Sequence, residues 1–306
     1  MSTAVRLPSA ALGVRPAGRL RRRVRENVTA YGLLCAALLV FAGFSWYPIV
    51  RGILLSFQQV NFVSAPTWVG LENFQKLFAD PQFGEAWLNT LLFTALALVF
   101  GFAVPFAVAV LLNELRHGKG YFRLVVYLPV MLPPVVVALL WKWFYDPGPG
   151  LFNTALHAVG LPGLAWLNSP TTAMLSLVLV STWANMGSAT LIYLAALQTI
   201  PGDLYEAADV DGAGPVQKFL HVTLPQLRPV IISMAVLDLI WTSQQFALIW
   251  MTTGGGPLNT TEMLSTYTYK QAFSEYEFAT ASAAAVVVLM LTMILAFFYV
   301  RQQRER

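Results

Sequence analysis

Several stretches of this chain run for 18 residues or more without a single Asp, Glu, Lys or Arg. The clearest have 24, 28, 18 and 23 residues, and they are Asn27–Val50, Ala86–Asn113, Leu124–Trp141 and Phe278–Val300. A helix rises about 1.5 Å per residue, so about 20 apolar residues cross the hydrocarbon layer of a bilayer. These stretches therefore predict membrane-spanning helices.

Two longer uncharged regions must be divided. Pro147–Gly202 has 56 uncharged residues, and its first part is rich in Pro, Gly and Asn. We expect a helix and loop at the outer membrane face over 148–168, then a span over 172–198. A sixth span over 229–251 is interrupted only by Asp238.

The sequence thus predicts an all-α, polytopic membrane protein with six transmembrane helices. The first helix is expected over 27–57, followed by an extracytoplasmic connection over 58–84. A core domain over 85–300 then holds the remaining spans, which are predicted over 86–112, 124–141, 172–198, 229–251 and 278–300, with a cytoplasmic tail over 301–306.

Composition excludes the other broad classes. Only 11% of the 306 residues are charged, against about 25% in an ordinary soluble domain, while 57% are apolar. A nucleic-acid-binding domain is excluded despite the net charge of +4, because seven of the 19 basic residues lie in the first 25 positions. That clustering predicts a basic, disordered cytoplasmic tail over 1–26 that faces the membrane surface.

The distribution of Lys and Arg predicts the orientation. The tails and the connections on one side of the membrane hold 15 of these residues, and the connections on the other side hold four. Cytoplasmic segments carry the surplus of positive charge. Both termini are therefore expected in the cytoplasm of a cell that carries this multi-pass protein in its cytoplasmic membrane.

Residues for metal, disulfide or nucleotide chemistry are scarce. Cys35 is the only cysteine, so no disulfide forms within the chain, and we expect this thiol to be buried in its apolar run. The three histidines form no HExxH pair, and no GxxxxGK[ST] motif occurs. We therefore expect neither a bound cofactor or metal nor an ATP site on this chain.

The 201–228 connection differs from the other cytoplasmic segments because it is acidic. Asp203, Glu206 and Asp209 recur every three residues and would form a stripe on a helix that begins near Pro201. Gly212 and Gly214 end that helix, and a second short helix is expected over Pro215–Val222. Leu224-Pro225 is then expected to return the chain to the membrane.

This spacing resembles the EAA loop of the permease subunits of ABC importers. The resemblance rests on Glu206-Ala207-Ala208, Gly212 and Leu224-Pro225, with Val222 where the family usually has Ile. Segments elsewhere look like the carbohydrate-uptake group: Tyr47-Pro48-Ile49, Leu55-Ser56-Phe57, Val69–Phe74, Asn89-Thr90, Leu128-Pro129, Trp141-Lys142-Trp143, Asp209–Ala213, Thr253–Pro257 and Thr260-Thr261-Glu262. The similarity covers about residues 44–300.

The resemblance implies a type I ABC importer permease without catalytic residues or enzyme activity. It implies three partners: a cytoplasmic ATPase dimer that uses the ATP, a second and different permease subunit, and an extracytoplasmic solute-binding protein. Carried over residue by residue, the positions that dock the ATPase would be Glu206, Ala207, Ala208, Asp209, Gly212, Leu224 and Pro225. The solute would be a sugar or a related polyol.

Polar residues inside two predicted spans are candidates for a solute path. Asp238, Trp241 and Gln245 stand at 0, +3 and +7 on one helix, next to Gln244, and Asn185 stands on the preceding span between Ser181 and Ser188. A charge at this depth costs at least about 2.5 kcal/mol, so Asp238 is expected to face protein or water. Both a role in the path and a role as interhelical hydrogen-bond partners stay open for these residues.

Two other functions are compatible with parts of the sequence. An ABC permease for a non-sugar solute would share the 201–225 loop. A secondary transporter driven by an ion gradient would use Asp238 as the carrier of the ion, and it would be active without an ATPase. A membrane-embedded enzyme is disfavoured, because the only cluster of acids is Asp203–Asp211 and the resemblance explains it by docking.

Overall fold

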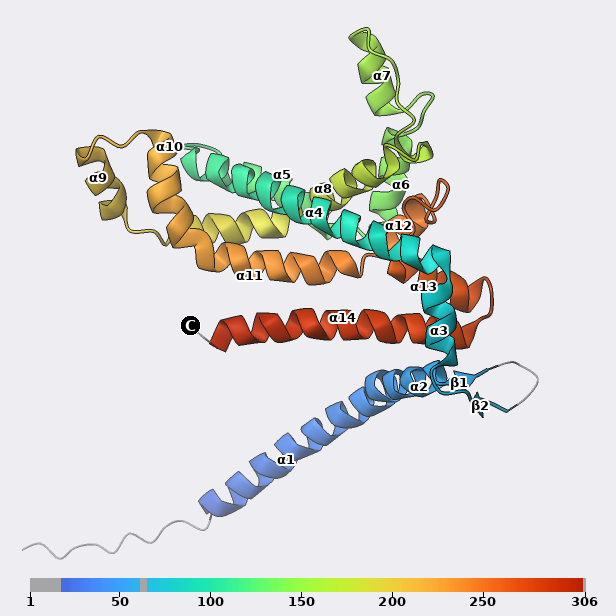
Figure 1. Cartoon of the computed structure of the whole chain (residues 1–306). Coiled ribbons are helices and arrows are strands. Elements are labelled where there is room, and N and C mark those ends of the chain that lie inside the picture. The colour runs from blue at the N-terminus through green and yellow to red at the C-terminus, as the bar shows by residue number, and fades with distance from the viewer. Residues whose placement is uncertain (1–17, 61–64, 305–306) are drawn as a thin grey trace, which may run out of the picture. The chain divides into compact units, whose positions relative to one another are not determined.

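The computed structural model describes residues 18–60 and 65–304, and most of them are helical (Figure 1). The helices are α1 Gly18–Phe41, α2 Tyr47–Ser56, α3 Glu72–Ala79, α4 Pro81–Glu114, α5 Lys119–Tyr127, α6 Pro134–Phe144, α7 Leu151–Ala158, α8 Ala173–Leu197, α9 Gly202–Val210, α10 Pro215–Lys218, α11 Leu224–Ser243, α12 Ala247–Thr252, α13 Leu264–Phe273 and α14 Phe278–Arg304. Short π or 3₁₀ turns are η1 Ala42–Trp46, η2 Leu128–Met131, η3 Trp166–Asn168 and η4 Phe219–Thr223.

Five helical segments are long and apolar enough to span a membrane. These are Ala30–Ser56, Pro81–Glu114, Ala173–Leu197, Pro215–Ser243 and Phe278–Arg301, and a bent pair of helices brings the number to six if it is one span. The chain is therefore an all-helical polytopic membrane protein apart from one small exception. Gln58–Gln59 (β1) pairs antiparallel with Thr67–Trp68 (β2), an element that the sequence did not predict.

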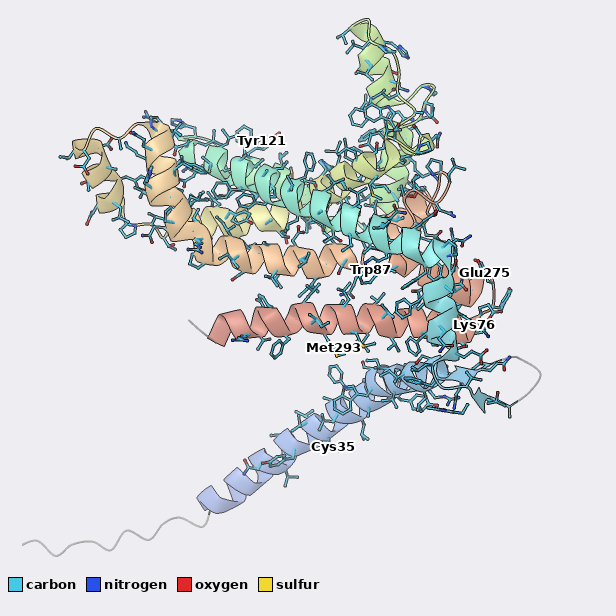
Figure 2. The ribbon with its side chains drawn as sticks, viewed as in Figure 1. Cys35, Lys76, Trp87, Tyr121, Glu275 and Met293 are labelled. Atoms are coloured by element: carbon cyan, nitrogen blue, oxygen red, sulfur yellow. The ribbon has the colours of Figure 1, made fainter. Side chains whose placement is uncertain are left out.

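The chain divides into two compact units, Met1–Gly52 and Ile53–Arg306. In the first, α1 already begins at Gly18, so residues 18–26 of the predicted basic tail are helical rather than disordered. The part of that tail before Gly18 lies outside the described residues. The prediction of a buried Cys35 is wrong, because its side chain is exposed on α1 (Figure 2). An apolar side chain can be exposed on a helix that is long enough to span a bilayer, because lipid surrounds it there.

Two predicted spans differ from the structure. The 124–141 stretch is not one helix, because α5 with η2 and then α6 form a pair bent by 101°. Leu132 and Pro133 separate the two halves, and two consecutive prolines remove backbone donors at the break. The 229–251 stretch also breaks, because α11 ends at Ser243 and α12 begins at Ala247.

Helices α4 and α8 lie side by side along much of their lengths, and α11 packs on α4 (Figure 1). One buried cluster joins α4, α8 and the start of α11 and includes Phe106, Leu112, Tyr193 and Leu227. A second cluster joins α4, α6, α8 and α12, and a third joins α3, α4, α13 and α14. Met293 on α14, in contrast, points away from these clusters and is exposed (Figure 2).

The two ends of this second unit carry different elements. Figure 1 shows α9 and α10 at one end of α4, α8 and α11, and it shows α6, α7, α12 and α13 at the other end. The acidic connection and the glycine-rich connection therefore lie at opposite ends of the helices.

Helices α8 and α5 approach each other closely at Gly187 of α8. A Cβ atom placed there would lie 2.6 Å from the carbonyl oxygen of Val126 and 2.8 Å from Cα of Tyr127, both backbone atoms of α5. Only a residue without a side chain lets α8 approach α5 so closely. The packing of the bent pair on α8 therefore depends on this glycine.

We predict that Gly187→Ala destabilises the protein by about 1–3 kcal/mol, because the added methyl group overpacks this contact. The measurement is the apparent melting temperature of the purified protein in detergent. Gly84→Ala on α4 is the control, since a Cβ there meets nothing within 4 Å. Equal melting temperatures for the two variants would contradict the close approach of α5 and α8.

Candidate coupling and solute sites

The acidic connection folds as a helix, a turn and a second helix. Helix α9 carries Asp203, Glu206 and Asp209, and its end is closed by two backbone bonds: Gly212 N donates to the carbonyl of Asp209 over 3.1 Å, and Ala213 N donates to that of Ala208 over 2.9 Å. This is the Schellman pattern of helix ends. Gly212 has φ +75°, in the left-handed region that favours glycine, so its place in the motif has a conformational reason.

Side chains fix the second helix against the first. The Lys218 ammonium group pairs with the Asp209 carboxylate, and Tyr205 and Thr223 share a hydrogen bond of 2.9 Å between their hydroxyl groups. Lys218, Tyr205 and Thr223 are not among the residues predicted from the sequence for this site. The ion pair could have been predicted from the sequence, because Lys218 follows Asp209 by nine positions across the turn between two helices.

The free surface of this helix pair is both acidic and apolar. Glu206 and Ala207 are exposed, Ala208 is half-buried, and Val210 and Val216 expose 88% and 70% of their surfaces. Large apolar side chains that are this exposed beside carboxylates are typical of a surface that a partner covers. Sequence reasoning missed the two valines because single exposed valines are common.

Leu224 and Pro225 are not a loop that leads the chain back to the membrane, as predicted, but part of a continuous helix. Helix α10, the π turn η4 and α11 run on without a break from Pro215 to Ser243. Pro225 lacks the N–H that an α-helical ladder needs at this point, and a π turn directly precedes it. A force on α10 is therefore applied to the same continuous helix that carries Asp238.

Asp238 lies where α11 meets α4. A Cβ atom at Gly101 would lie 3.0 Å from Asp238 Oδ2, so the carboxylate rests directly on the backbone of α4. Within the described part of the chain, this buried oxygen has no hydrogen-bond partner. A buried polar atom without a partner costs about 1–3 kcal/mol, which favours a functional reason for its presence.

The other candidates on this helix are placed differently from the prediction. Trp241 is 76% exposed on α11, three residues after Asp238. Gln244 and Gln245 follow the end of α11, so Gln245 does not share a helical face with Asp238, and the expected 0, +3, +7 alignment is wrong for this residue. The Gln245 carbonyl instead accepts a bond of 2.6 Å from the Ser265 hydroxyl of α13, which holds the break.

On α8, Asn185 and Ser188 are exposed, whereas Ser181 is buried. The Asn185 amide donates to the Ser181 carbonyl of its own helix over 2.8 Å. Asn185 therefore keeps its amide oxygen available on an exposed polar strip of α8. Within the described part of the chain, the hydrogen bond that this side chain makes stays inside its own helix.

The glycine-rich connection is held by residues of distant segments. Asn89 Nδ2 donates to the carbonyls of Asn259 and Glu262 over 2.8 and 3.1 Å, and the Thr90 hydroxyl accepts from Leu264 N over 2.9 Å. Glu262, only 2% exposed, pairs with Lys270 at 2.8 Å. The segments Asn89-Thr90 and Thr260-Thr261-Glu262, far apart in the sequence, are thus in contact in the structure.

Two further side chains fix the neighbouring elements. Asn73 Nδ2 donates to the carbonyls of Ser56 and Gln58 over 2.9 Å each, which ties α3 to β1. Tyr267 donates to Asp80 Oδ2 over 2.5 Å. Burial, reinforced by the Asp80 carboxylate, raises the pKa of the Tyr267 hydroxyl above its ordinary value, so this donor stays protonated. Asn73 and Asp80, which belong to the predicted 58–84 connection, are thus tied to α2, β1 and α13.

Comparison with known proteins identifies the family. A family model described as "binding-protein-dependent transport system inner membrane component" matches residues 103–306, two thirds of the chain. The probable ABC transporter permease protein YurN of Bacillus subtilis (strain 168) is 38% identical over 283 residues, which cover 91% of this chain and 97% of YurN. The sulfoquinovosyl glycerol transport system permease protein SmoG of Agrobacterium fabrum (strain C58 / ATCC 33970) is 34% identical over 278 residues, 90% of each chain.

Solved structures agree with this result. A chain of a bacterial ABC transporter involved in the import of the acidic polysaccharide alginate superposes with a TM-score of 0.80 at 28% identity, covering 94% of this chain and 99% of that one. A chain of the MetNI methionine transporter, 21% identical with a TM-score of 0.53, shares the fold alone.

The resemblance seen in the 201–225 loop is confirmed. The family's members are the components of the cytoplasmic membrane in transporters that receive solute from a binding protein, and their ATP is hydrolysed by a separate subunit. The chain belongs to the family of binding-protein-dependent transport system inner membrane components, as a permease subunit of an ABC importer.

Proposed function

We propose that this chain is one of two permease subunits that move a sugar or a related polyol inward across the cytoplasmic membrane. The relatives support the solute class, because SmoG is named for sulfoquinovosyl glycerol and the structural relative for alginate. The protein of Pectobacterium atrosepticum that is 32% identical over 263 residues is named for sn-glycerol-3-phosphate. All three solutes carry several hydroxyl groups.

The proposed architecture has six spans, with the bent pair α5–α6 as the third, and both termini in the cytoplasm. The 15 to 4 distribution of basic residues and the bend of 101° support it. In this arrangement α9 and α10 lie at the cytoplasmic face, and α7, α12 and α13 lie outside. The glycine-rich connection then faces the solute-binding protein.

The observation that carries the proposal is the geometry of the α9–α10 pair. Its exposed carboxylates and valines form a surface for the ATPase, and the Asp209–Lys218 pair makes the two helices move together. Glu206, Ala207, Ala208, Asp209 and Gly212 are the proposed docking positions, and Leu224 and Pro225 connect them to α11. A secondary transporter would have no use for such a surface.

Coupling is tested by charge and by backbone conformation. We expect Glu206→Lys to abolish ATP-driven uptake while the chain still reaches the membrane, because it reverses the charge that the ATPase meets. Glu85→Lys, an exposed acid at the start of α4, is the control for charge reversal. Normal uptake in Glu206→Lys vesicles would reject the docking surface.

Three substitutions of Gly212, in the turn after α9, are expected to lower the uptake rate by different amounts. Gly212→Asn is expected to retain more uptake than Gly212→Ala, and Gly212→Val is expected to retain least, because a left-handed conformation costs about 1–2 kcal/mol for ordinary residues and less for Asn. The measurement is the initial uptake rate divided by the amount of chain in the membrane. Equal rates for Asn and Val would show that the shape of the turn is irrelevant to coupling.

The proposed solute path runs along the polar strip of α8 and the part of α11 near its end, with Asn185, Asp238, Trp241, Gln244 and Gln245. Carboxylate and amide groups bind hydroxyls, and an exposed tryptophan can stack on a sugar ring. Asp238 is proposed to face the path in at least one state, which would explain why its buried oxygen lacks a partner.

For this path, we expect Asp238→Asn and Trp241→Ala each to lower the uptake rate at limiting solute about tenfold, equivalent to about 1.4 kcal/mol. Trp143→Ala removes another exposed tryptophan and should leave uptake unchanged. Uptake is measured in vesicles with the complete transporter. Wild-type kinetics in both path variants would remove these residues from the path.

A further inference from the structure

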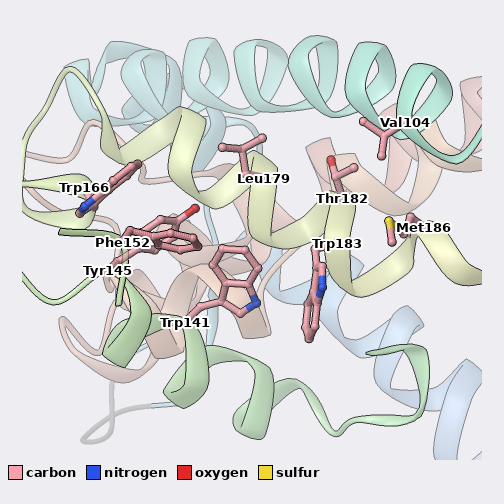
Figure 3. Close-up of a pocket in the computed structure, with 9 residues that line it drawn as sticks. All are labelled: Val104, Trp141, Tyr145, Phe152, Trp166, Leu179, Thr182, Trp183 and Met186. Atoms are coloured by element: carbon pink, nitrogen blue, oxygen red, sulfur yellow. The ribbon is translucent and has the colours of Figure 1, made fainter. Parts of the chain in front are cut away.

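A pocket of about 320 Å³ lies between α4, α6, α7 and α8 (Figure 3). One wall is aromatic, with Trp141, Tyr145 and Phe152 from α6, its end and α7, followed by Trp166 of η3. The wall on α8 contains Leu179, Thr182, Trp183 and Met186. No part of the transport function described above uses this pocket.

The pocket does not belong to the proposed solute path. Leu179 and Ser188 are nine residues apart on α8, which is two and a half turns at about 3.6 residues per turn. Leu179 therefore lies on the opposite side of the helix from Ser188, and Ser188 belongs to the exposed polar strip with Asn185. The two sides of α8 differ in chemistry as well as in direction.

Two buried polar atoms line an otherwise apolar space. Trp141 and Thr182 are each only 8% exposed, and among the described residues neither Trp141 Nε1 nor Thr182 Oγ1 has a hydrogen-bond partner. A solute with many hydroxyls would leave most of them unpaired here, which is unfavourable. A long apolar group with one or two polar atoms matches the lining better.

The pocket extends from the membrane interface toward the interior of the bilayer, as a lipid chain does. Trp141 lies three residues before the end of α6, and Tyr145 and Trp166 belong to the connection between spans, where Trp and Tyr favour the membrane interface. Met186 lies 13 residues after the start of α8, about 20 Å deeper at 1.5 Å per residue. Figure 3 shows the rings of Trp166, Tyr145, Trp141 and Trp183 following one another along α8.

The rim of the pocket is apolar and exposed. Leu179 exposes 36% of its surface, and Leu175, one turn before it on the same stripe of α8, exposes 44%. An exposed apolar stripe on a membrane-spanning helix is compatible with the hydrocarbon of a bilayer. A lipid chain that lies along this stripe reaches the pocket at its lining residue Leu179.

We propose that this pocket binds one acyl chain of a membrane phospholipid. The chain runs along α8 past Leu179 toward Met186, and its ester carbonyl accepts a hydrogen bond from Trp141 Nε1. Because α6 is the second half of the bent pair, the bound chain fills the space between this half and α8.

The test is a titration of the purified, delipidated transporter, complete with its ATPase, with phosphatidylcholine. Native mass spectrometry counts the lipid that each complex retains. We expect saturable retention by wild type, at least tenfold weaker retention by Leu179→Trp, which fills the pocket, and unchanged retention by the matched control Ile192→Trp, an apolar residue that is 45% exposed on another side of α8. Glycerophosphocholine, which has the headgroup without the chains, should not compete.

A second variant keeps the proposal testable if Leu179→Trp does not fold. Trp141→Phe preserves the aromatic wall but removes the indole donor, and we expect it to weaken retention several-fold without changing the melting temperature. The proposal is overturned if wild type retains no phosphatidylcholine, if Ile192→Trp and Leu179→Trp lose retention equally, or if Trp141→Phe retains as much as wild type. It is also overturned if a methyl glycoside displaces the lipid, since the pocket would then bind solute.

Discussion

The hydrocarbon of a bilayer provides no hydrogen-bond partners, so each backbone N–H and C=O group in a span must find one within the protein. Long helices meet this constraint by themselves in α8 and α14, whereas α4 contains Pro105, which lacks an N–H. Where a helix breaks, other residues compensate: Ser265 binds the carbonyl of Gln245 beyond the end of α11, and Gly187 brings α8 directly against the bent pair.

In the proposed architecture, the same constraint explains how a movement of α9 and α10 can reach the solute path. The α9–α10 pair is held by the Asp209–Lys218 ion pair, and α10 continues through a π turn into α11. Asp238 rests on Gly101 of α4, so a tilt of α11 changes the surroundings of its carboxylate. At the other end, Asn89 of α4 holds the glycine-rich connection. Helices α4 and α11 therefore link both partner surfaces.

Sequence reasoning succeeded where a single local property decides the structure. Uncharged length predicted α4, α8 and α14, and Gly212 predicted the turn after α9. It failed where distant contacts decide: nothing local marks the end of α11 at Ser243, and Pro133-Pro134 marks the break between α5 and α6 but does not give its angle of 101°. The contact between Asn89 and Asn259 joins residues 170 positions apart. The aromatic pocket likewise needs four elements that only the fold brings together.

The central claim is that this chain moves solute only when a separate ATPase acts on α9 and α10. The most direct measurement is solute accumulation in proteoliposomes that contain both permease subunits and the binding protein, with ATP, in the presence and absence of the ATPase. The account predicts accumulation only when the ATPase is present. Accumulation without it, driven by an imposed proton or sodium gradient, would contradict the account.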